Sequence, residues 1–148
     1  MEDALKRNFK KGDCIYVVDY WGFCDGTRAF CTRAYIESVN NENETFIADM
    51  YGDTYQRYSF KDYGRLIFDT ESEAAEAAIK LPKPNQTVYQ VIGKRVYEKL
   101  VEGIRGRSID MTYDLVVCFY RGKDVSIKEI GHSLFYSREE AIKKRNKK

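Results

Sequence analysis

The stretch that decides the fold occurs twice in the chain: residues 60–74 are FKDYGRLIFDTESEA and residues 127–141 are IKEIGHSLFYSREEA. A glycine, a phenylalanine, a hydroxyl residue and a Glu-Ala pair recur at matching positions, 67 residues apart. Each copy is typical of a short strand, a glycine turn, a second short strand and the start of a helix. The chain is therefore predicted to be a diverged tandem repeat.

Both copies carry a helix-start signal. Thr70 and Ser137 are each followed three residues later by glutamate, which is the capping-box pattern. In this pattern the hydroxyl accepts a hydrogen bond from the glutamate N–H, and the glutamate reaches back to the N–H of the cap. The first helix is rich in alanine and is expected to stop before Pro82. The second is expected to run into the basic tail and to fray there.

The segments before these motifs also correspond, with altered spacing. Residues 15–18 resemble 88–91, residues 36–39 resemble 101–104, and residues 45–49 fall where 113–117 fall. We therefore predict a mainly β protein with two strand-rich repeats, residues 1–81 and 82–148, each of four or five short strands closed by one helix. Residues 81–86 join them. The alternative is one mixed domain in which the similarity is accidental.

Turn residues predict two hairpins in the first repeat. Asp25-Gly26 suits a type I′ turn, which needs positive φ at both positions, and Gly52-Asp53 suits a type II′ turn between residues 45–51 and 54–60. Around the first turn, the core face should carry Ile15, Val17, Trp21, Phe30, Ala34 and Ile36. The opposite, less apolar face should carry Tyr16, Val18, Tyr20, Cys31, Arg33 and Tyr35.

Composition places the chain among folded globular proteins. Its 148 residues are 43% hydrophobic and 32% charged, which suits one ordinary domain or two very small ones and excludes a large multidomain enzyme or a disordered tail. Twelve tyrosines and eight phenylalanines favour strands over a helical bundle. No stretch approaches the roughly 20 apolar residues of a membrane helix, and the first residues lack the apolar core of a signal peptide. We expect a cytoplasmic protein without a membrane partner.

The net charge of +2 conceals a difference between the two halves. Residues 1–81 contain 15 acidic and 10 basic residues, whereas residues 82–148 contain 8 acidic and 15 basic residues. The second half could therefore face a polyanion or an acidic protein surface. In the alternative interpretation, the halves partly neutralise each other and the run KKRNKK at 143–148 is a solvated tail.

Five short strands in about 60 residues usually avoid free edges by curling into a small barrel. The succession of hairpin, strand pair, glycine turn and Phe-x-[Ser/Thr]-x-x-Glu-Ala resembles uncharacterised small proteins of bacteria and their phages, most clearly through residues 60–74 and 127–141. The resemblance implies a tandem of two diverged small SH3-like barrels or curled sheets, each closed by one helix. The shared motif is structural, so it carries no catalytic residue over. The long first hairpin, residues 14–39, departs from the usual pattern.

Catalytic and metal chemistry finds little support. The four cysteines (Cys14, Cys24, Cys31 and Cys118) lack zinc-knuckle spacing, and reduced thiols are expected because Cys24 and Cys31 are out of cross-strand register. The single histidine, His132, occupies the position that Arg65 holds in the first repeat, which indicates surface polarity and not acid–base chemistry. Residues 103–107, GIRGR, could form a flexible basic loop but lack the signature of a nucleotide loop. We predict a non-enzyme with no metal and no cofactor.

The candidate binding surface is aromatic and basic. The predicted partner-binding residues are Tyr16, Tyr20, Arg33, Tyr35, Arg57 and Tyr58. Tyrosine and arginine are favoured anchors of protein interfaces, and tyrosines can also stack on nucleic-acid bases. In the alternative interpretation, these tyrosines cover the other half of the tandem.

Two functions compete. The first is a non-enzymatic protein that engages a protein or nucleoprotein partner by stoichiometric occlusion; resemblance to mobile-element proteins extends this to an inhibitor of a host system, such as an anti-CRISPR. The second is direct nucleic-acid binding, with polyanion contacts from Lys94, Arg95, Arg105, Arg107, Lys143, Lys144 and Arg145. Phosphate binding would weaken steeply with salt. Charge reversal at Arg105 and Arg107 should abolish the second activity and spare the first.

Overall fold

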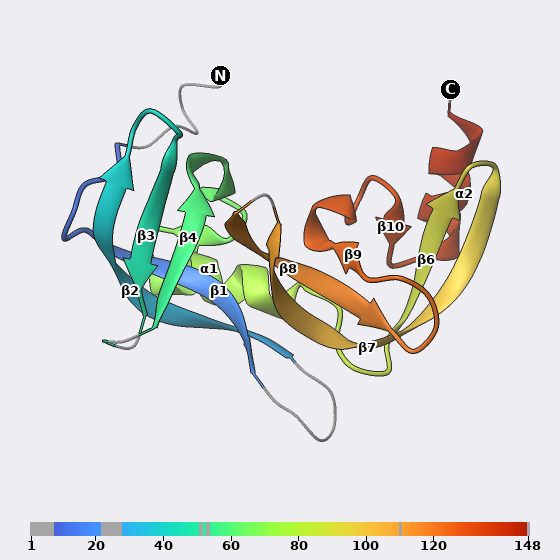
Figure 1. Ribbon diagram of the computed structural model, residues 1–148. Coiled ribbons are helices and arrows are strands. Elements are labelled where there is room, and N and C mark those ends of the chain that lie inside the picture. The colour runs from blue at the N-terminus through green and yellow to red at the C-terminus, as the bar shows by residue number, and fades with distance from the viewer. Residues whose placement is uncertain (1–7, 22–27, 51, 53, 110, 148) are drawn as a thin grey trace. The chain divides into compact units, whose positions relative to one another are not determined.

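The chain folds into two series of short strands, each ending in a helix (Figure 1). The computed structural model describes residues 8–21, 28–50, 52, 54–109 and 111–147. The first series comprises β1 (Cys14–Trp21), β2 (Arg28–Asn40), β3 (Thr45–Asp49), β4 (Tyr55–Ser59), the 3-10 turn η2 (Phe60–Asp62), β5 (Ile67–Phe68) and α1 (Glu71–Ile79). The second comprises β6 (Thr87–Ile92), β7 (Arg95–Ile109), β8 (Thr112–Phe119), β9 (Val125–Ser126), η3 (Ile127–Glu129), β10 (Leu134–Phe135) and α2 (Arg138–Asn146).

Each series forms one five-stranded antiparallel sheet. The strand order is β4-β3-β2-β1-β5 in the first sheet and β10-β6-β7-β8-β9 in the second. Strands β1 to β5 therefore match β6 to β10 one for one, because the short fifth strand of each series pairs with the first: β5 with β1, and β10 with β6. The prediction of a mainly β fold with two strand-rich units and terminal helices is confirmed.

The repeated glycine turn has the same backbone in both copies. Gly64 and Gly131 have φ of +86° and +88°, in the left-handed region that favours glycine. Gly64 N donates to Ile67 O and Gly131 N donates to Leu134 O, both at 2.8 Å. The turn before each first strand also recurs: Gly12 N donates to Ile36 O, and Asn85 N donates to Val101 O, both at 2.7 Å. These bonds confirm that residues 36 and 101 correspond.

The predicted match between residues 45–49 and 113–117 identifies the right strands but the wrong register. Thr45 lies opposite Ser59, and the matching Ser126 lies opposite Val116. Thr45 therefore corresponds to Val116, three residues beyond the predicted Tyr113. The difference arises because the β7–β8 hairpin is longer than the β2–β3 hairpin, and sequence spacing does not reveal how far a hairpin extends beyond its sheet.

The two helices begin at the predicted caps. Thr70 Oγ1 accepts from Glu73 N at 3.3 Å, and Ser137 Oγ accepts from Glu140 N at 3.2 Å. Residues 143–146 continue α2 as a regular helix up to Asn146. In the part of the chain that the structure describes, no helix is both long and apolar enough to cross a bilayer.

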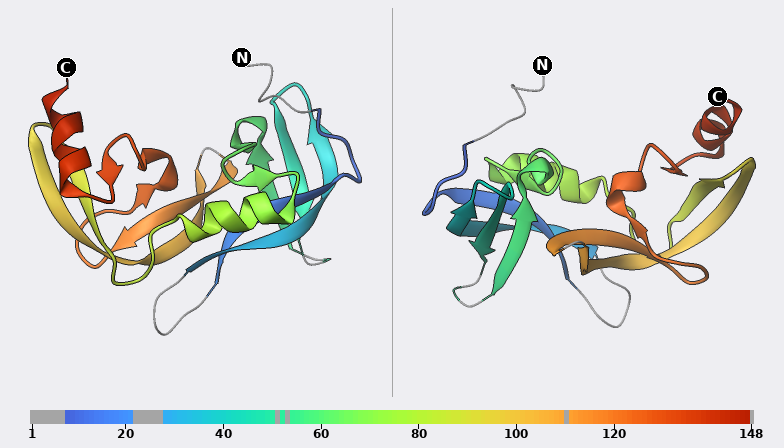
Figure 2. Two further views of the ribbon diagram at one scale, coloured as in Figure 1. Left: turned by 180° about the vertical axis from the view of Figure 1, so that it is seen from behind. Right: turned by 45° about the horizontal axis from the view of Figure 1, so that its top comes forward.

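The core face of the first hairpin is largely as predicted, since Ile15, Val17, Ala34 and Ile36 are buried. Val18, predicted on the less apolar face, is also fully buried. Helix α1 accounts for this, because it lies along β1 and β2 with Cys31 Sγ 3.9 Å from Glu71 O (Figure 2). The Asp25-Gly26 turn and the Trp21 side chain lie outside the described residues. Strands β3 and β4 form the expected second hairpin, but Asp49 pairs with Tyr55 and Met50 N donates to Thr54 O, which is one residue out of register with a two-residue turn at Gly52-Asp53. Tyr51 and Asp53 lie outside the described residues.

Contacts divide the chain into two compact units. The first contains the described parts of residues 1–19 and 29–81 together with the tip of the β7–β8 hairpin, residues 106–114. The second contains those of residues 20–28, 82–105 and 115–148. Residues 103–107, which the sequence left open as a flexible basic loop, lie inside β7 and form part of that strand. Glycine at position 106 leaves room for the Tyr113 ring, because a Cβ atom there would lie 1.9 Å from Tyr113 Oη.

Candidate functional site

Strands β2, β3 and β4 present a surface that we call the outer face. Cross-strand pairing places three rows of side chains on it: Tyr35–Asp49–Tyr55, Ser38–Ile47–Arg57 and Asn40–Thr45–Ser59. The alternate residues, including Ile36, Ala48 and Phe46, point to the opposite side and are buried. The outer face is therefore formed by side chains that the core does not use.

Tyrosine and arginine dominate the exposed area of the outer face. Tyr35 is 49% exposed and Tyr55 is 53% exposed. Arg33 lies two residues before Tyr35 on the same side of β2, and its Nη1 donates to Tyr35 Oη at 3.5 Å. This hydrogen bond, with smaller contributions from the nearby Tyr16 and Cys14, raises the pKa of Arg33, so its guanidinium stays charged. Arg57 on β4 is also exposed, in the row next to that of Tyr35 and Tyr55.

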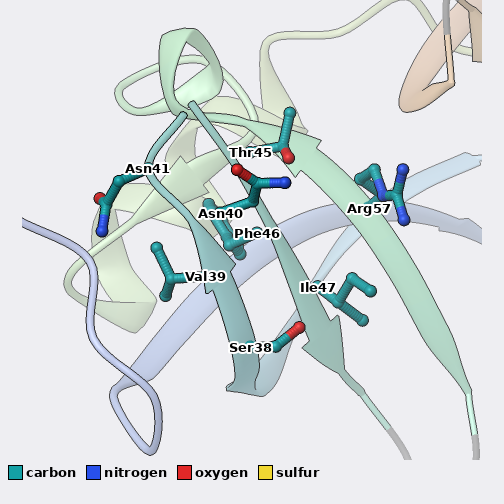
Figure 3. Close-up of a pocket in the computed structure, with 8 residues that line it drawn as sticks. All are labelled: Ser38, Val39, Asn40, Asn41, Thr45, Phe46, Ile47 and Arg57. Carbon is teal, nitrogen blue, oxygen red and sulfur yellow. The ribbon is translucent and has the colours of Figure 1, made fainter. Parts of the chain in front are cut away.

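A hollow of about 400 Å³ lies at one end of this face (Figure 3). Arg57 on β4, Ile47 on β3 and Ser38 on β2 line it across the three strands, and Asn40 and Thr45 add amide and hydroxyl groups. Its lining offers both donors and acceptors and one positive charge. Such a hollow can receive a polar or acidic side chain of a partner.

The first unit contains four of the six predicted partner-binding residues. Arg33, Tyr35 and Arg57 are exposed on β2 and β4, and Tyr16 is half-buried on β1, which neighbours β2. Tyr58 was wrongly predicted: it is fully buried, and its hydroxyl lies 3.7 Å from Met50 Sδ. Neighbouring residues of a strand point to opposite faces, so Arg57 and Tyr58 cannot share one. Tyr20 is exposed but groups with the second unit.

Sequence reasoning missed Tyr55, the most exposed aromatic residue of the outer face. Its position two residues before Arg57 is the signal that could have identified it, because strand residues with this spacing share a face. Ile47, which lies between Ser38 and Arg57, was missed for a different reason. Apolar strand residues are normally assigned to the core, yet Ile47 faces the hollow and is only half-buried.

The matching positions of the second sheet carry a different set of side chains. Because Ile36 and Val101 accept matching hydrogen bonds, Tyr35 corresponds to Leu100 and Arg33 corresponds to Glu98. Because Ser59 and Ser126 hold matching places in strand pairing, Arg57 corresponds to Asp124. The same backbone therefore forms with the charges reversed. The repeated fold does not require the tyrosines and arginines of the first copy, which favours a binding role for them.

The predicted polyanion-binding residues fall into two groups. Lys94 and Arg95 lie at the β6–β7 turn, and Lys143, Lys144 and Arg145 lie on the last turns of α2; all five belong to the second unit. Arg105 and Arg107 lie further along β7. Arg105 Nη2 is 3.9 Å from Glu102 Oε1, and Arg107 groups with the first unit.

The first unit also contains buried charges. Arg65 Nη1 donates to Asp114 Oδ1 at 2.8 Å, and Arg65 Nη2 donates to Asp62 Oδ1 at 2.5 Å. Both carboxylates are at least 95% buried, and the Arg65 side chain is 24% exposed. The interpretation of position 65 as surface polarity was therefore wrong. Close by in the chain, Tyr113 Oη donates to Asp19 Oδ1 at 2.6 Å, so both groups secure residues 113 and 114 within the unit.

Replacing Asp62 by asparagine tests the electrostatics of this cluster. Burial, opposed by Arg65, raises the pKa of Asp62 in the folded protein. A carboxyl with a raised folded pKa binds its proton more readily when folded, so it costs stability as pH rises above its usual value of about 4. The free energy of unfolding of Asp62→Asn, relative to the parent, should therefore increase between pH 4 and pH 7. Urea unfolding across this range measures it, and a difference that stays constant would contradict the shift.

The thiol of Cys118, His132 and the metal-ligating side chains were the remaining candidates for reactive groups among the described residues. Burial raises the pKa of the Cys118 thiol to about 11, which keeps it protonated and weakly nucleophilic at neutral pH. His132 is exposed, and no cluster of three or more metal-ligating side chains occurs among the residues that the structure places. The outer face of the first sheet is therefore the best-formed candidate site. Comparison with protein-family models, curated proteins and solved structures finds no match to the chain.

Proposed function

We propose that this protein is a non-enzymatic binding module that covers a site on a protein or nucleoprotein partner with the outer face of its first sheet. The observation that carries the proposal is the set of exposed Arg33, Tyr35, Tyr55 and Arg57 on a sheet whose repeat folds without them. Binding of this kind needs shape and charge, and no reacting group.

The chemistry of the outer face indicates the kind of partner surface. Tyrosine and arginine supply most of the binding energy in many protein interfaces, and truncation of such an anchor typically costs 2 kcal/mol or more. The two guanidinium groups favour acidic groups on the partner, and Asp49 between Tyr35 and Tyr55 can accept hydrogen bonds. A strand surface with a hollow beside Arg57 suits a folded protein surface with a protruding acidic side chain.

The proposal predicts that Tyr35→Ser combined with Tyr55→Ser weakens partner binding at least 100-fold, because two anchors are lost. The experiment has two steps. Tagged parent protein captures partners from host lysate with and without nuclease, and each captured protein is then purified and titrated calorimetrically against parent and variant. A 1:1 complex that survives nuclease and is lost in the double variant supports the proposal.

The matched control is Leu100→Ser combined with Tyr120→Ser, which removes two exposed apolar side chains from the corresponding row of the second sheet. This control should bind the partner like the parent. Equal losses in both double variants, or a complex that disappears with nuclease, would overturn the assignment to the outer face. The melting temperatures of the parent and the Tyr35→Ser/Tyr55→Ser variant are compared. Equal values show that the tyrosines serve binding, and a lower value for the variant shows that they support the fold.

A further inference from the structure

The end of α2 and the β6–β7 turn lie side by side in the second unit. All views show the last turn of the red helix next to the yellow hairpin end (Figures 1 and 2). Ala141 of α2 is fully buried, and the Arg138 guanidinium lies 5.6 Å from the centre of the Tyr89 ring on β6. Helix α2 is thus packed on β6, and the fold joins two segments that are about fifty residues apart in the chain.

Together these segments form a patch that we call the basic end. It contains six exposed cations: Lys94, Arg95, Lys143, Lys144, Arg145 and Lys147. Residues 92–95 and 143–147 contain no acidic side chain, and within the described chain no ion pair involves any of the six. Six of the fifteen basic residues of the second half therefore lie in this patch, and the nearest acidic residues on α2 are Glu139 and Glu140, one helical turn before Lys143 and Lys144.

The cations at the end of α2 are exposed on more than one side of the helix. Lys143 follows the buried Ala141 by two residues and points to the opposite side, Lys144 follows it by three, and Lys147 is the C-cap just beyond Asn146. Cations at a helix C-terminus also favour the helix dipole. That effect accounts for basic residues in the last turn of α2, but it does not account for Lys94 and Arg95, which lie on a hairpin.

We propose that the basic end binds the phosphate backbone of nucleic acid without reading its sequence. Lysines are strongly hydrated point charges on flexible stems, which suit a row of phosphates. Membrane insertion requires a broad apolar helix face, and the exposed residues of α2 are all charged or polar. This activity is separate from the outer face and goes beyond the proposed partner binding.

Arg105 and Arg107 are not part of the basic end. These two arginines lie along β7, where Arg105 is near Glu102 and Arg107 belongs to the other compact unit. Their charge reversal was expected to abolish nucleic-acid binding. The concentration of six cations elsewhere now makes them a suitable control.

The test uses the full-length protein and a fluorescein-labelled 20-base-pair DNA duplex, with binding followed by polarisation. Six phosphate contacts predict that affinity falls on the order of 1,000-fold between 50 and 200 mM salt. The variant Lys143→Gln/Lys144→Gln/Lys147→Gln should lose about 100-fold in affinity at 50 mM salt, and the slope of log affinity against log salt should decrease by about three. Lys94→Gln/Arg95→Gln should lose affinity in the same way, with a slope decrease of about two.

The control Arg105→Gln/Arg107→Gln/Lys123→Gln removes the same charge from other exposed positions. We expect it to change affinity less than about threefold, and the Tyr35→Ser/Tyr55→Ser variant to bind the duplex like the parent. Equal losses of affinity in the Lys143→Gln/Lys144→Gln/Lys147→Gln variant and in the control would overturn the proposed site, because binding would then depend only on the net charge of the protein. The absence of duplex binding by the parent at 50 mM salt, or tighter binding to phosphatidylserine vesicles than to the duplex, would also overturn it.

Discussion

Replacement of Arg65 by methionine is expected to lower the free energy of unfolding by about 3 kcal/mol. The guanidinium of Arg65 is the shared partner of Asp62 and Asp114, which are both buried. Its removal takes the Arg65 charge from two buried carboxylates that lie close together, and removing one partner of a buried ion pair is strongly destabilising. Urea unfolding at pH 7 measures the effect.

The tandem repeat supplies an internal control for this change. His132 occupies the matching position after Gly131, but it is exposed. His132→Met should therefore change stability by less than about 0.5 kcal/mol. Adding Asp62→Asn and Asp114→Asn to Arg65→Met should recover much of the loss, because two buried negative charges disappear. If Arg65→Met is no more destabilising than His132→Met, the cluster does not hold residues 113 and 114 in place.

The second large effect is expected from Gly106→Ala. A Cβ atom at this position would lie 1.9 Å from Tyr113 Oη and 2.4 Å from Tyr113 Cζ, so the ring would have to move. Moving the ring breaks its 2.6 Å hydrogen bond to the buried Asp19. We expect a loss of about 2–4 kcal/mol, which combines overpacking with the loss of a hydrogen bond to a buried carboxylate.

A double-mutant cycle isolates the cause of this loss. In the background Tyr113→Ala the ring is absent, so Gly106→Ala should then change stability by less than about 0.5 kcal/mol. Thermal or urea unfolding of the four proteins gives the coupling energy. Additive losses would show that alanine is unfavourable at position 106 for a reason other than the tyrosine ring.

Local sequence signals predicted the repeated parts of the fold well. Thr70 and Ser137 act through residues three positions away, and Gly64 and Gly131 act through their own φ, so both features can be seen in the sequence. The candidate site was predicted in part, through Arg33, Tyr35 and Arg57. Tyr58 was misassigned because the alternation of β4 was not applied to it.

Long-range packing was not predictable in the same way. Arg65 and Asp114 are 49 residues apart, and Tyr113 and Asp19 are 94 residues apart. No local pattern shows that the tip of the β7–β8 hairpin belongs with the first unit. For the same reason, the sequence left open a loop at residues 103–107, where the structure has a strand whose Gly106 leaves room for the Tyr113 ring.

The amino-acid sequence alone determined that the chain is a tandem of two β units, since helix caps, glycine turns and strand alternation depend on neighbours within a few residues. Only the tertiary structure decided which charges are buried, which tyrosines are exposed and which cations form one patch. These properties depend on what lies across the sheet or against the helix, and those neighbours are brought together by folding over distances that sequence spacing does not encode.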